Sequence, residues 1–302
     1  MAGTIVDFFG YRAADDSDAS LEAVAKKLCP FLHGTCTKTL SDGSCSGVCA
    51  VKQVSSDQRI ICCPIRLYAD DYEILRIVSR KTFGVDLGLY SGRAAVGKAR
   101  SEGGAVAVFG HGWGGELRLP KRNGAGSYFA DWVLARLDER GELAEFTSIE
   151  VQTIDTTGNY RDSRAGLIDG RREVKSNVGL NWENVSKRII PQLVYKGQVL
   201  QREPLCHSGL WFVTPEPVYS RIIDRLGGAG NMAFGYAPQP GALHFLRYDY
   251  DDNVEYAKGV PTKLMVAGDE CTTVEQVQAA FNRVRLPEPG VYGNALREAL
   301  YG

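Results

Sequence analysis

Cysteine is the residue type whose spacing most clearly suggests chemistry in this sequence. Six of the eight cysteines fall within 35 residues, among Gly, Ser, Thr and Asp: Cys29, Cys36, Cys45, Cys49, Cys62 and Cys63. This segment has too few apolar residues for a core of its own, so we expect a metal or cross-links to stabilise it. The first ten residues lack a cationic region followed by an apolar run, so we expect no signal peptide. In an intracellular protein, clustered cysteines favour a metal over disulfides, and four thiolates suit zinc or iron.

Carboxylates near the middle of the chain form a second group of candidates. Glu150 and Gln152 lie two residues apart in an apolar segment, so in a strand they would share a face. Asp131 begins another such segment, and a charged turn at 138–141 would bring it toward Glu150 in a hairpin. Glu116 could add a third carboxylate from the side. Carboxylates that converge on adjacent strands suit Mg²⁺ and phosphate chemistry, although a solvated strand face gives the same pattern.

Basic residues follow the candidate catalytic strand directly. Segment 155–176 contains Arg161, Arg164 and Arg171, and arginine can read guanine through two hydrogen bonds. We therefore expect DNA contacts here, while a solvated charged surface is the alternative. His111, near Glu116, is a candidate phosphate contact.

Periodicity and turn signals indicate the elements that must position these residues. Helical spacing predicts helices over 20–28, 70–82, 92–102, 181–200, 215–226 and 273–285, with Pro191 weakening the fourth. Apolar segments between Gly-rich or charged turns predict strands over 105–109, 116–119, 128–137, 146–154 and 209–214. The order of a helix, a run of strands, a helix and a strand indicates an α/β fold. We expect a mixed sheet flanked by helices, with an N-terminal metal-binding module.

The overall composition is balanced. The chain has 302 residues, 35 basic and 36 acidic side chains and a formal charge of -1, with length enough for one large or two modest domains. This charge neither indicates nor excludes nucleic acid as a partner, because binding depends on where the charges lie. No apolar run approaches the roughly 18 residues that a membrane helix needs. We therefore expect a soluble cytoplasmic protein with no membrane partner.

At these residues the chain resembles the NotI-type restriction endonucleases. The resemblance consists of ordered, discontinuous segments from residue 8 to about 226. They are Phe8-Phe9-Gly10, Cys29-Pro30-Phe31-Leu32, Cys36-Thr37-Lys38, Gly47-Val48-Cys49, Cys63-Pro64, Ser79-Arg80-Lys81 with Phe83-Gly84, Gly114-Gly115-Glu116-Leu117, Asp131-Trp132, Glu150-Val151-Gln152-Thr153, and Asn184-Val185 with Lys187-Arg188.

This resemblance implies a PD-(D/E)xK nuclease core with an added four-cysteine iron site. The implied iron ligands are Cys29, Cys36, Cys49 and Cys63, and zinc suits these sulfurs equally well. Cys45 and Cys62 have no counterparts in the resemblance. From the residues alone, the adjacent Cys62 and Cys63 project differently and are not expected to bind one ion together, whereas the choice between Cys45 and Cys49 stays open.

The resemblance also implies an active site formed by Glu116, Asp131, Glu150 and Gln152, with Asp131 and Glu150 as the Mg²⁺ ligands. Gln152 stands where the motif usually has lysine. A neutral amide can orient a water or a phosphate oxygen, but it cannot act as a general base.

The activity implied is that of a type II restriction endonuclease. It would cut both strands of double-stranded DNA at a GC-rich palindrome with a GGCC core, such as CGGCCG, leaving 5′-phosphate and 3′-hydroxyl ends. A palindrome cut on both strands implies a homodimer, and a cognate DNA methyltransferase would be the genetic partner in restriction-modification. The alternatives are a DNA-repair or nicking nuclease on the same core, and a non-catalytic, metal-containing DNA-binding protein.

The expected division of the chain has three parts. Residues 1–84 carry the four-cysteine module, residues 85–226 form the catalytic core, and residues 227–302 are a C-terminal extension whose role the sequence does not indicate.

Overall fold

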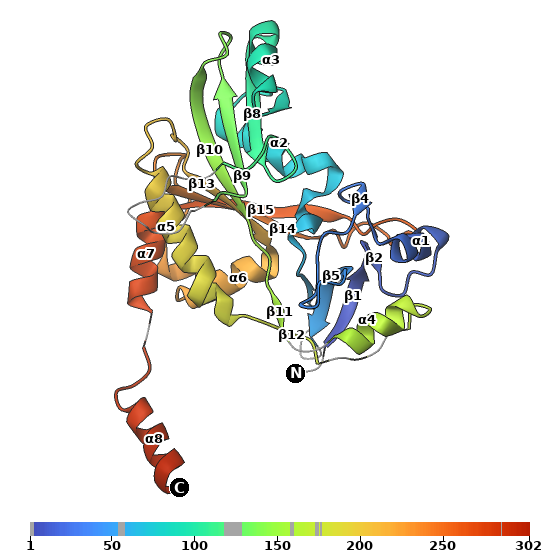
Figure 1. Cartoon of the computed structure of the whole chain (residues 1–302). Helices are drawn as coiled ribbons and strands as arrows, with labels where there is room; N and C mark the ends of the chain where they lie inside the picture. Colours follow the sequence, from blue (N-terminus) through green and yellow to red (C-terminus); the bar gives the residue numbers. More distant parts are fainter. Residues whose placement is uncertain are drawn as a thin grey trace.

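A seven-stranded mixed sheet forms the centre of the molecule (Figure 1). The computed structural model describes residues 3–53, 58–117, 129–157, 160–172, 175, 177–284 and 286–302. The strand order is β15-β14-β13-β10-β9-β8-β7. These strands are β7 (Leu89–Ser91), β8 (Ala105–Gly110), β9 (Trp132–Leu137), β10 (Leu143–Val151), β13 (Leu210–Pro215), β14 (Ala242–Tyr250) and β15 (Leu264–Thr273). The expected α/β class with a mixed sheet is confirmed.

Strand β10 stands where the pairing changes from antiparallel to parallel. It pairs antiparallel with β9 and parallel with β13, and β8 is antiparallel to β9. The turn between β9 and β10 is closed by a hydrogen bond from the Gly141 N–H to the Asp138 carbonyl, 2.9 Å long. Gly141 has a φ of 76°, which favours glycine because a side chain would be strained there. The turn expected at 138–141 is therefore confirmed.

Helices cover both faces of the central sheet, because successive side chains of each strand point to opposite sides. Ile149 and Val151 of β10 pack in one core with α2. Phe212 of β13 and Phe245 of β14 pack in the other core with α5, α6 and α7. Helix α3 packs on the edge formed by β7 and β8. The bounds are α2 (Ala69–Phe83), α3 (Ala94–Glu102), α5 (Ile190–Leu200), α6 (Glu216–Arg225) and α7 (Val274–Arg283).

The N-terminal residues form a smaller, four-stranded sheet with the order β2-β1-β5-β6. Leu167 of α4 joins its core, although α4 follows β10 in sequence. The cysteine-rich segment runs through this region. Its elements are β1 (Gly3–Phe8), β2 (Tyr11–Arg12), α1 (Asp18–Lys26), β3 (Leu28–Cys29), β4 (Gly34–Thr35), β5 (Val48–Gln53), β6 (Arg59–Ile61), the 3-10 helix η1 (Pro64–Tyr68) and, from later in the chain, β11 (Thr156–Thr157), α4 (Arg161–Ile168) and β12 (Gly179–Leu180).

A buried polar cluster joins the smaller sheet to the central one. Asp7 of β1 and Arg66 of η1 are 2% and 1% exposed, and Arg66 Nε lies 3.9 Å from Asp7 Oδ2. The hydroxyl of Tyr250, in β14, donates a hydrogen bond of 2.6 Å to Asp7 Oδ2. Burial raises the pKa of Asp7, whereas Arg66 and Tyr250 act to lower it. Because a buried acid requires such partners, this cluster holds the two sheets together.

Several expected elements differ from those observed. The helix expected at 181–200 is divided: a π-helical turn, η2 (Val185–Ile189), precedes α5 at the point where Pro191 removes a backbone donor. Glu116 and Leu117 lie outside any strand, and the rest of the strand expected at 116–119 lies outside the described residues. The strand expected at 128–137 begins at Trp132, and Tyr128 is likewise not among the described residues.

The segment 227–302 contributes directly to the central sheet. It supplies β14, parallel to β13, and β15, antiparallel to β14. It also contains the short 3-10 helix η3 (Ala229–Asn231), α7 and α8 (Val291–Tyr301). Helix α8 stands apart from the rest of the molecule in Figure 1 and has no buried residue. Among the described residues, no helix combines the length and the apolar character needed to cross a membrane.

We expect Tyr250→Phe to lower the free energy of unfolding by about 1–3 kcal/mol, because Asp7 would stay buried and lose a hydrogen bond. Urea unfolding followed by circular dichroism measures this change. The control is Tyr292→Phe in α8, where the tyrosine is 88% exposed. The control should change stability by less than about 0.5 kcal/mol. Equal effects of the two substitutions would contradict the role given to the Asp7 cluster.

Candidate functional site

The register of the β9–β10 hairpin brings Asp131 and Glu150 together. Ile149 pairs with Trp132, so Glu150 and Asp131, the next residues along, face each other across the two strands. The backbone N–H of Val151 donates a hydrogen bond of 2.8 Å to Asp131 Oδ2. Since Ile149 and Val151 enter the core with α2, Glu150 points to the opposite face, where α5 lies. The expected hairpin pairing is confirmed.

Lys196 of α5 completes this cluster, although no sequence motif singled it out. Its Nζ lies 2.5 Å from Glu150 Oε1, and both side chains are 13% exposed. Lys196 shares a helical stripe with Leu193 and Leu200, which are buried. A lysine on the apolar stripe of a helix is the sequence signal that could have identified it. We call Glu116, Asp131, Glu150 and Lys196 the carboxylate–lysine cluster.

Burial and mutual repulsion weaken both acids of the hairpin. Burial raises the pKa of Glu150 to about 7; the charge of Asp131 adds to this effect, and Lys196 opposes it. The pKa of Asp131 is also raised, first by desolvation and then by Glu116, while the Val151 amide and Lys196 act to lower it. Asp131 nevertheless keeps contact with solvent. Two adjacent acids with raised pKa values are typical of a functional site, and a bound cation would stabilise their charged forms.

Glu116 and Gln152 lie at the edge of this cluster. Glu116 is exposed on the segment after β8, its Oε1 is 3.5 Å from His111 Nδ1, and its charge raises the pKa of Asp131. Gln152 directly follows β10, but its amide donates a hydrogen bond of 2.8 Å to the Thr153 carbonyl. The structure thus gathers Glu116, Asp131 and Glu150, and turns the Gln152 amide toward its own backbone.

An open groove of about 600 Å³ runs beside the cluster. Its walls include residues of α3 and α5, and strands β8, β9 and β10 supply its floor. The floor is largely apolar and includes Phe109, Val133 and Phe146. Lys196 lines the groove, as does Ala130, the neighbour of Asp131. A molecule lying in this groove would therefore reach the carboxylate–lysine cluster.

Four cysteines of the N-terminal region line one small cavity. They are the four that the resemblance implies as metal ligands, Cys29, Cys36, Cys49 and Cys63. Cys45 does not line the cavity. Every cysteine is a free thiol, and burial is the main cause that raises the pKa values of Cys29, Cys49 and Cys63. In the described part of the chain, no three His, Cys, Asp or Glu side chains are arranged closely enough to hold a metal ion.

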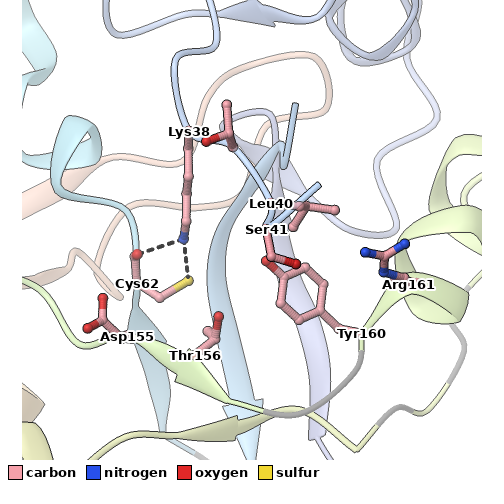
Figure 2. Close-up of a pocket in the computed structure, with 9 residues that line it drawn as sticks. Lys38, Leu40, Ser41, Cys62, Asp155, Thr156, Tyr160 and Arg161 are labelled. Atoms are coloured by element: carbon pink, nitrogen blue, oxygen red, sulfur yellow. Dashed lines mark hydrogen bonds between the residues drawn. The ribbon is translucent and has the colours of Figure 1, made fainter. Parts of the chain in front are cut away.

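Cys62 faces a different pocket from its neighbour Cys63. Figure 2 shows Lys38 reaching toward Cys62: its Nζ donates a hydrogen bond of 2.7 Å to the Cys62 carbonyl and lies 3.4 Å from Cys62 Sγ. This pocket, of about 360 Å³, is also lined by Asp155, Tyr160 and Arg161. The two adjacent cysteines therefore project into separate cavities, as expected.

The arginines expected to contact DNA lie in three different environments. Arg161 is 57% exposed and pairs with Asp42 at 2.9 Å. Arg164 donates hydrogen bonds to the carbonyls of Ser46 at 2.9 Å and Cys45 at 2.6 Å, so it connects α4 to the cysteine-rich segment. Arg171 is 7% exposed and donates to the Ser20 carbonyl at 3.1 Å. These contacts favour structural roles for Arg164 and Arg171 and leave Arg161 as the accessible candidate.

Comparison with known proteins identifies no relative of the chain. No model of a known protein family matches it, and no curated protein matches it either. A function must therefore be inferred from the geometry of the chain itself, together with the residues that carry the resemblance.

We expect Glu150→Gln to stabilise the protein at pH 8 by on the order of 2–3 kcal/mol. The native state raises the pKa of Glu150 from 4.5 to about 7, so it favours the protonated acid. The stability that this higher native pKa contributes is fully present below pH 4.5, where Glu150 is protonated, and it is lost as pH rises through about 7. The advantage of the variant should therefore shrink as pH falls from 7 to 4.5. Urea unfolding at several pH values measures this difference.

Glu145→Gln is the matched control for Glu150→Gln. Glu145 lies on the same strand and pairs with Arg136 at 2.7 Å, so its replacement should not stabilise the protein at pH 8. If Glu150→Gln were less stable than the wild type at every pH, burial of the ionised Glu150 would not destabilise the protein. The pKa of Glu150 would then not be raised in the native state.

Proposed function

We propose that the protein is a magnesium-dependent type II restriction endonuclease of the NotI type, which hydrolyses both strands of double-stranded DNA. The observation that carries this proposal is the pairing of Asp131 with Glu150 on adjacent strands beside an open groove. Paired carboxylates on neighbouring strands are a suitable site for a divalent cation that acts on phosphate. The resemblance implies the same two residues.

The topology of the central sheet supports the proposal. In sequence order, α3, β8, β9, β10, α5 and β13 give a helix, three antiparallel strands, a helix and a strand parallel to β10, with α4 and two short strands inserted before α5. The sequence indicated this order with a further strand at 116–119, where Glu116 and Leu117 lie outside any strand. The resemblance implies that the unit is a PD-(D/E)xK nuclease core.

The donor set of the site fits Mg²⁺. This ion prefers carboxylate oxygens and retained waters, and Asp131 and Glu150 would hold it. Burial and then the charge of Asp131 raise the pKa of Glu150, and a shared cation would offset both effects. When bound, Mg²⁺ would offset charge on a phosphate and lower the pKa of a water.

Gln152, Glu116 and Arg161 would each have a separate role in the reaction or in binding DNA. The Gln152 amide can donate and accept hydrogen bonds, so it would orient the attacking water once it leaves the Thr153 carbonyl. Glu116 would assist the metal or the water from the exposed edge of the cluster. Arg161 remains the proposed base contact, since its side chain is accessible.

The proposed substrate is a GC-rich palindrome with a GGCC core, such as CGGCCG. A twofold site cut on both strands calls for a homodimer, because two identical active sites must meet opposite strands. A cognate DNA methyltransferase would protect the same sequence in the host cytoplasm.

We further propose that Cys29, Cys36, Cys49 and Cys63 hold one structural metal ion, iron by the resemblance or zinc by the same thiolate chemistry. The support is that these four thiols line a single cavity while Cys45 and Cys62 do not. The raised pKa values of Cys29, Cys49 and Cys63 mean that binding must displace protons from these thiols, as metal binding by thiols requires. The site would stabilise a segment with few apolar residues.

We expect Asp131→Asn to lower the rate of DNA cleavage by about 100-fold or more, because it removes an ionised ligand and the charge stabilisation of the ion. Digestion of fully sequenced plasmid DNA with Mg²⁺, followed by mapping of the ends, measures this. The control is Asp138→Asn in the hairpin turn, whose Oδ1 only accepts backbone hydrogen bonds of 2.9 Å from Arg140 and Glu142. Discrete double-strand fragments from the wild type exclude a nicking enzyme, and wild-type rates for Asp131→Asn contradict the site.

We expect Cys63→Ser to lose the bound metal and Cys62→Ser to retain it, because only Cys63 faces the four-cysteine cavity. Elemental analysis of the purified proteins by mass spectrometry gives the metal content per chain. Since structural metal binding is coupled to folding, thermal unfolding of Cys63→Ser should also occur at lower temperature. Equal metal content in the two variants would show that the cavity does not hold the ion.

A further inference from the structure

Lys196 places a shielded positive charge at the carboxylates of the proposed nuclease site. Its Nζ lies 2.5 Å from Glu150 Oε1, and each side chain is 13% exposed. It comes from α5, whereas the two acids come from β9 and β10. Because Lys196 also lines the groove beside Ala130, its ammonium is within reach of a molecule that lies there.

Packing alone does not account for a lysine at this position. Leu193 and Leu200, on the same stripe of α5, are buried, and an apolar residue at 196 would continue that surface. The attraction between two buried charges often fails to offset the cost of removing them from water. The ion pair between Lys196 and Glu150 is therefore weak evidence of a stabilising role and favours a functional one.

Position 152, directly after β10, carries no positive charge. Gln152 has a neutral amide, which donates a hydrogen bond to the Thr153 carbonyl. In the reaction a water oxygen forms a bond to phosphorus, the bond from phosphorus to the 3′ oxygen breaks, and negative charge gathers on the phosphate oxygens. The water gives its proton to solvent, and the 3′ oxygen takes one up. A charged N–H donor stabilises this charge more strongly than an amide does.

We propose that Lys196 is a catalytic residue, which supplies from α5 a positive charge that the neutral Gln152 does not provide. In the transition state, its ammonium donates a hydrogen bond to a non-bridging oxygen of the scissile phosphate and keeps its proton. Three N–H donors allow the ammonium to bind Glu150 and a phosphate oxygen at once. This inference rests on the proposed nuclease function and deepens it, because it adds a group that acts on the substrate phosphate.

Single-turnover cleavage of sequenced plasmid DNA with Mg²⁺ tests the proposal. We expect Lys196→Gln to lower the rate by about 10²–10³-fold, as removal of one preorganised donor to a developing charge does. DNA affinity, measured with Ca²⁺ in place of Mg²⁺, should stay within about threefold of wild type, because the lost interaction belongs to the transition state. The matched control is Lys187→Gln, at a lysine 71% exposed in η2, which should leave both quantities unchanged.

A charge swap separates catalysis from folding. Gln152→Lys in the Lys196→Gln background restores an ammonium on the face of Glu150. We expect this double variant to recover about tenfold of the rate lost by Lys196→Gln, since the two positions would then serve one step. If thermal unfolding shows that Lys196→Gln does not fold, Lys196→Met takes its place, because methionine keeps the unbranched stem.

Two results overturn the role of Lys196 alone. The first is that the wild type cuts DNA and Lys196→Gln cuts it at a rate within about threefold of the wild-type rate. The other is a loss of rate that the charge swap does not recover, which would mean that Lys196 only supports the fold. A wild type that cuts no DNA with Mg²⁺ or Mn²⁺ overturns the proposed function itself, and that failure needs no variant to be recognised.

Discussion

The alternation of side chains along β10 is the constraint on which the rest of this structure depends. Ile149 and Val151 must enter the core with α2, so Glu150 has to point to the other face. Pairing with β9 then sets Asp131 opposite Glu150, and α5, packed on that face, brings Lys196 to them. A slip of one residue would turn the acid into the core and the apolar residues outward. The forces that hold the strand in register therefore also assemble the site.

Buried charge occurs at two places that differ in how well it is compensated. In the cluster that joins the two sheets, Asp7 is matched by Arg66 and by the Tyr250 hydroxyl. In the carboxylate–lysine cluster, Asp131 and Glu150 face each other, and Lys196 of α5 pairs with Glu150. Burial and then the charge of Asp131 raise the pKa of Glu150 to about 7. Burial raises the pKa of both Asp7 and Glu150, but only Glu150 faces a second acid of the same cluster, Asp131. Lys196 offsets part of that repulsion, and a bound cation would offset more of it.

The cysteine-rich region is held in place by residues that come much later in the chain. Arg164 binds the carbonyls of Ser46 and Cys45, and Leu167 of the same helix packs in the core of the smaller sheet. Tyr250 binds Asp7 from the central sheet. Contacts thus connect the three expected parts of the chain, residues 1–84, 85–226 and 227–302. A metal bound by the four cysteines would steady a region against which the segment after β10 is also packed.

Patterns of neighbouring residues in the sequence were enough to predict the local features of this protein. The two-residue spacing of Glu150 and Gln152, the turn ending at Gly141 and the different directions of Cys62 and Cys63 were readable because adjacent residues fix them. The alternation of apolar residues likewise indicated the mixed sheet. Strands β14 and β15 were not predicted from the sequence; they pair with each other and, through β14, with β13 earlier in the chain.

Only the tertiary structure decided which charges meet. Arg164 and Arg171 lie in the basic segment that we expected to contact DNA. In the folded protein they instead donate hydrogen bonds to the carbonyls of Ser46 and Ser20. Lys196 carried no motif, and it reaches Glu150 because α5 lies across the face of the sheet that bears the acid. Periodicity reports which side of an element is buried, but the identity of the neighbour depends on how helices and strands far apart in sequence pack together.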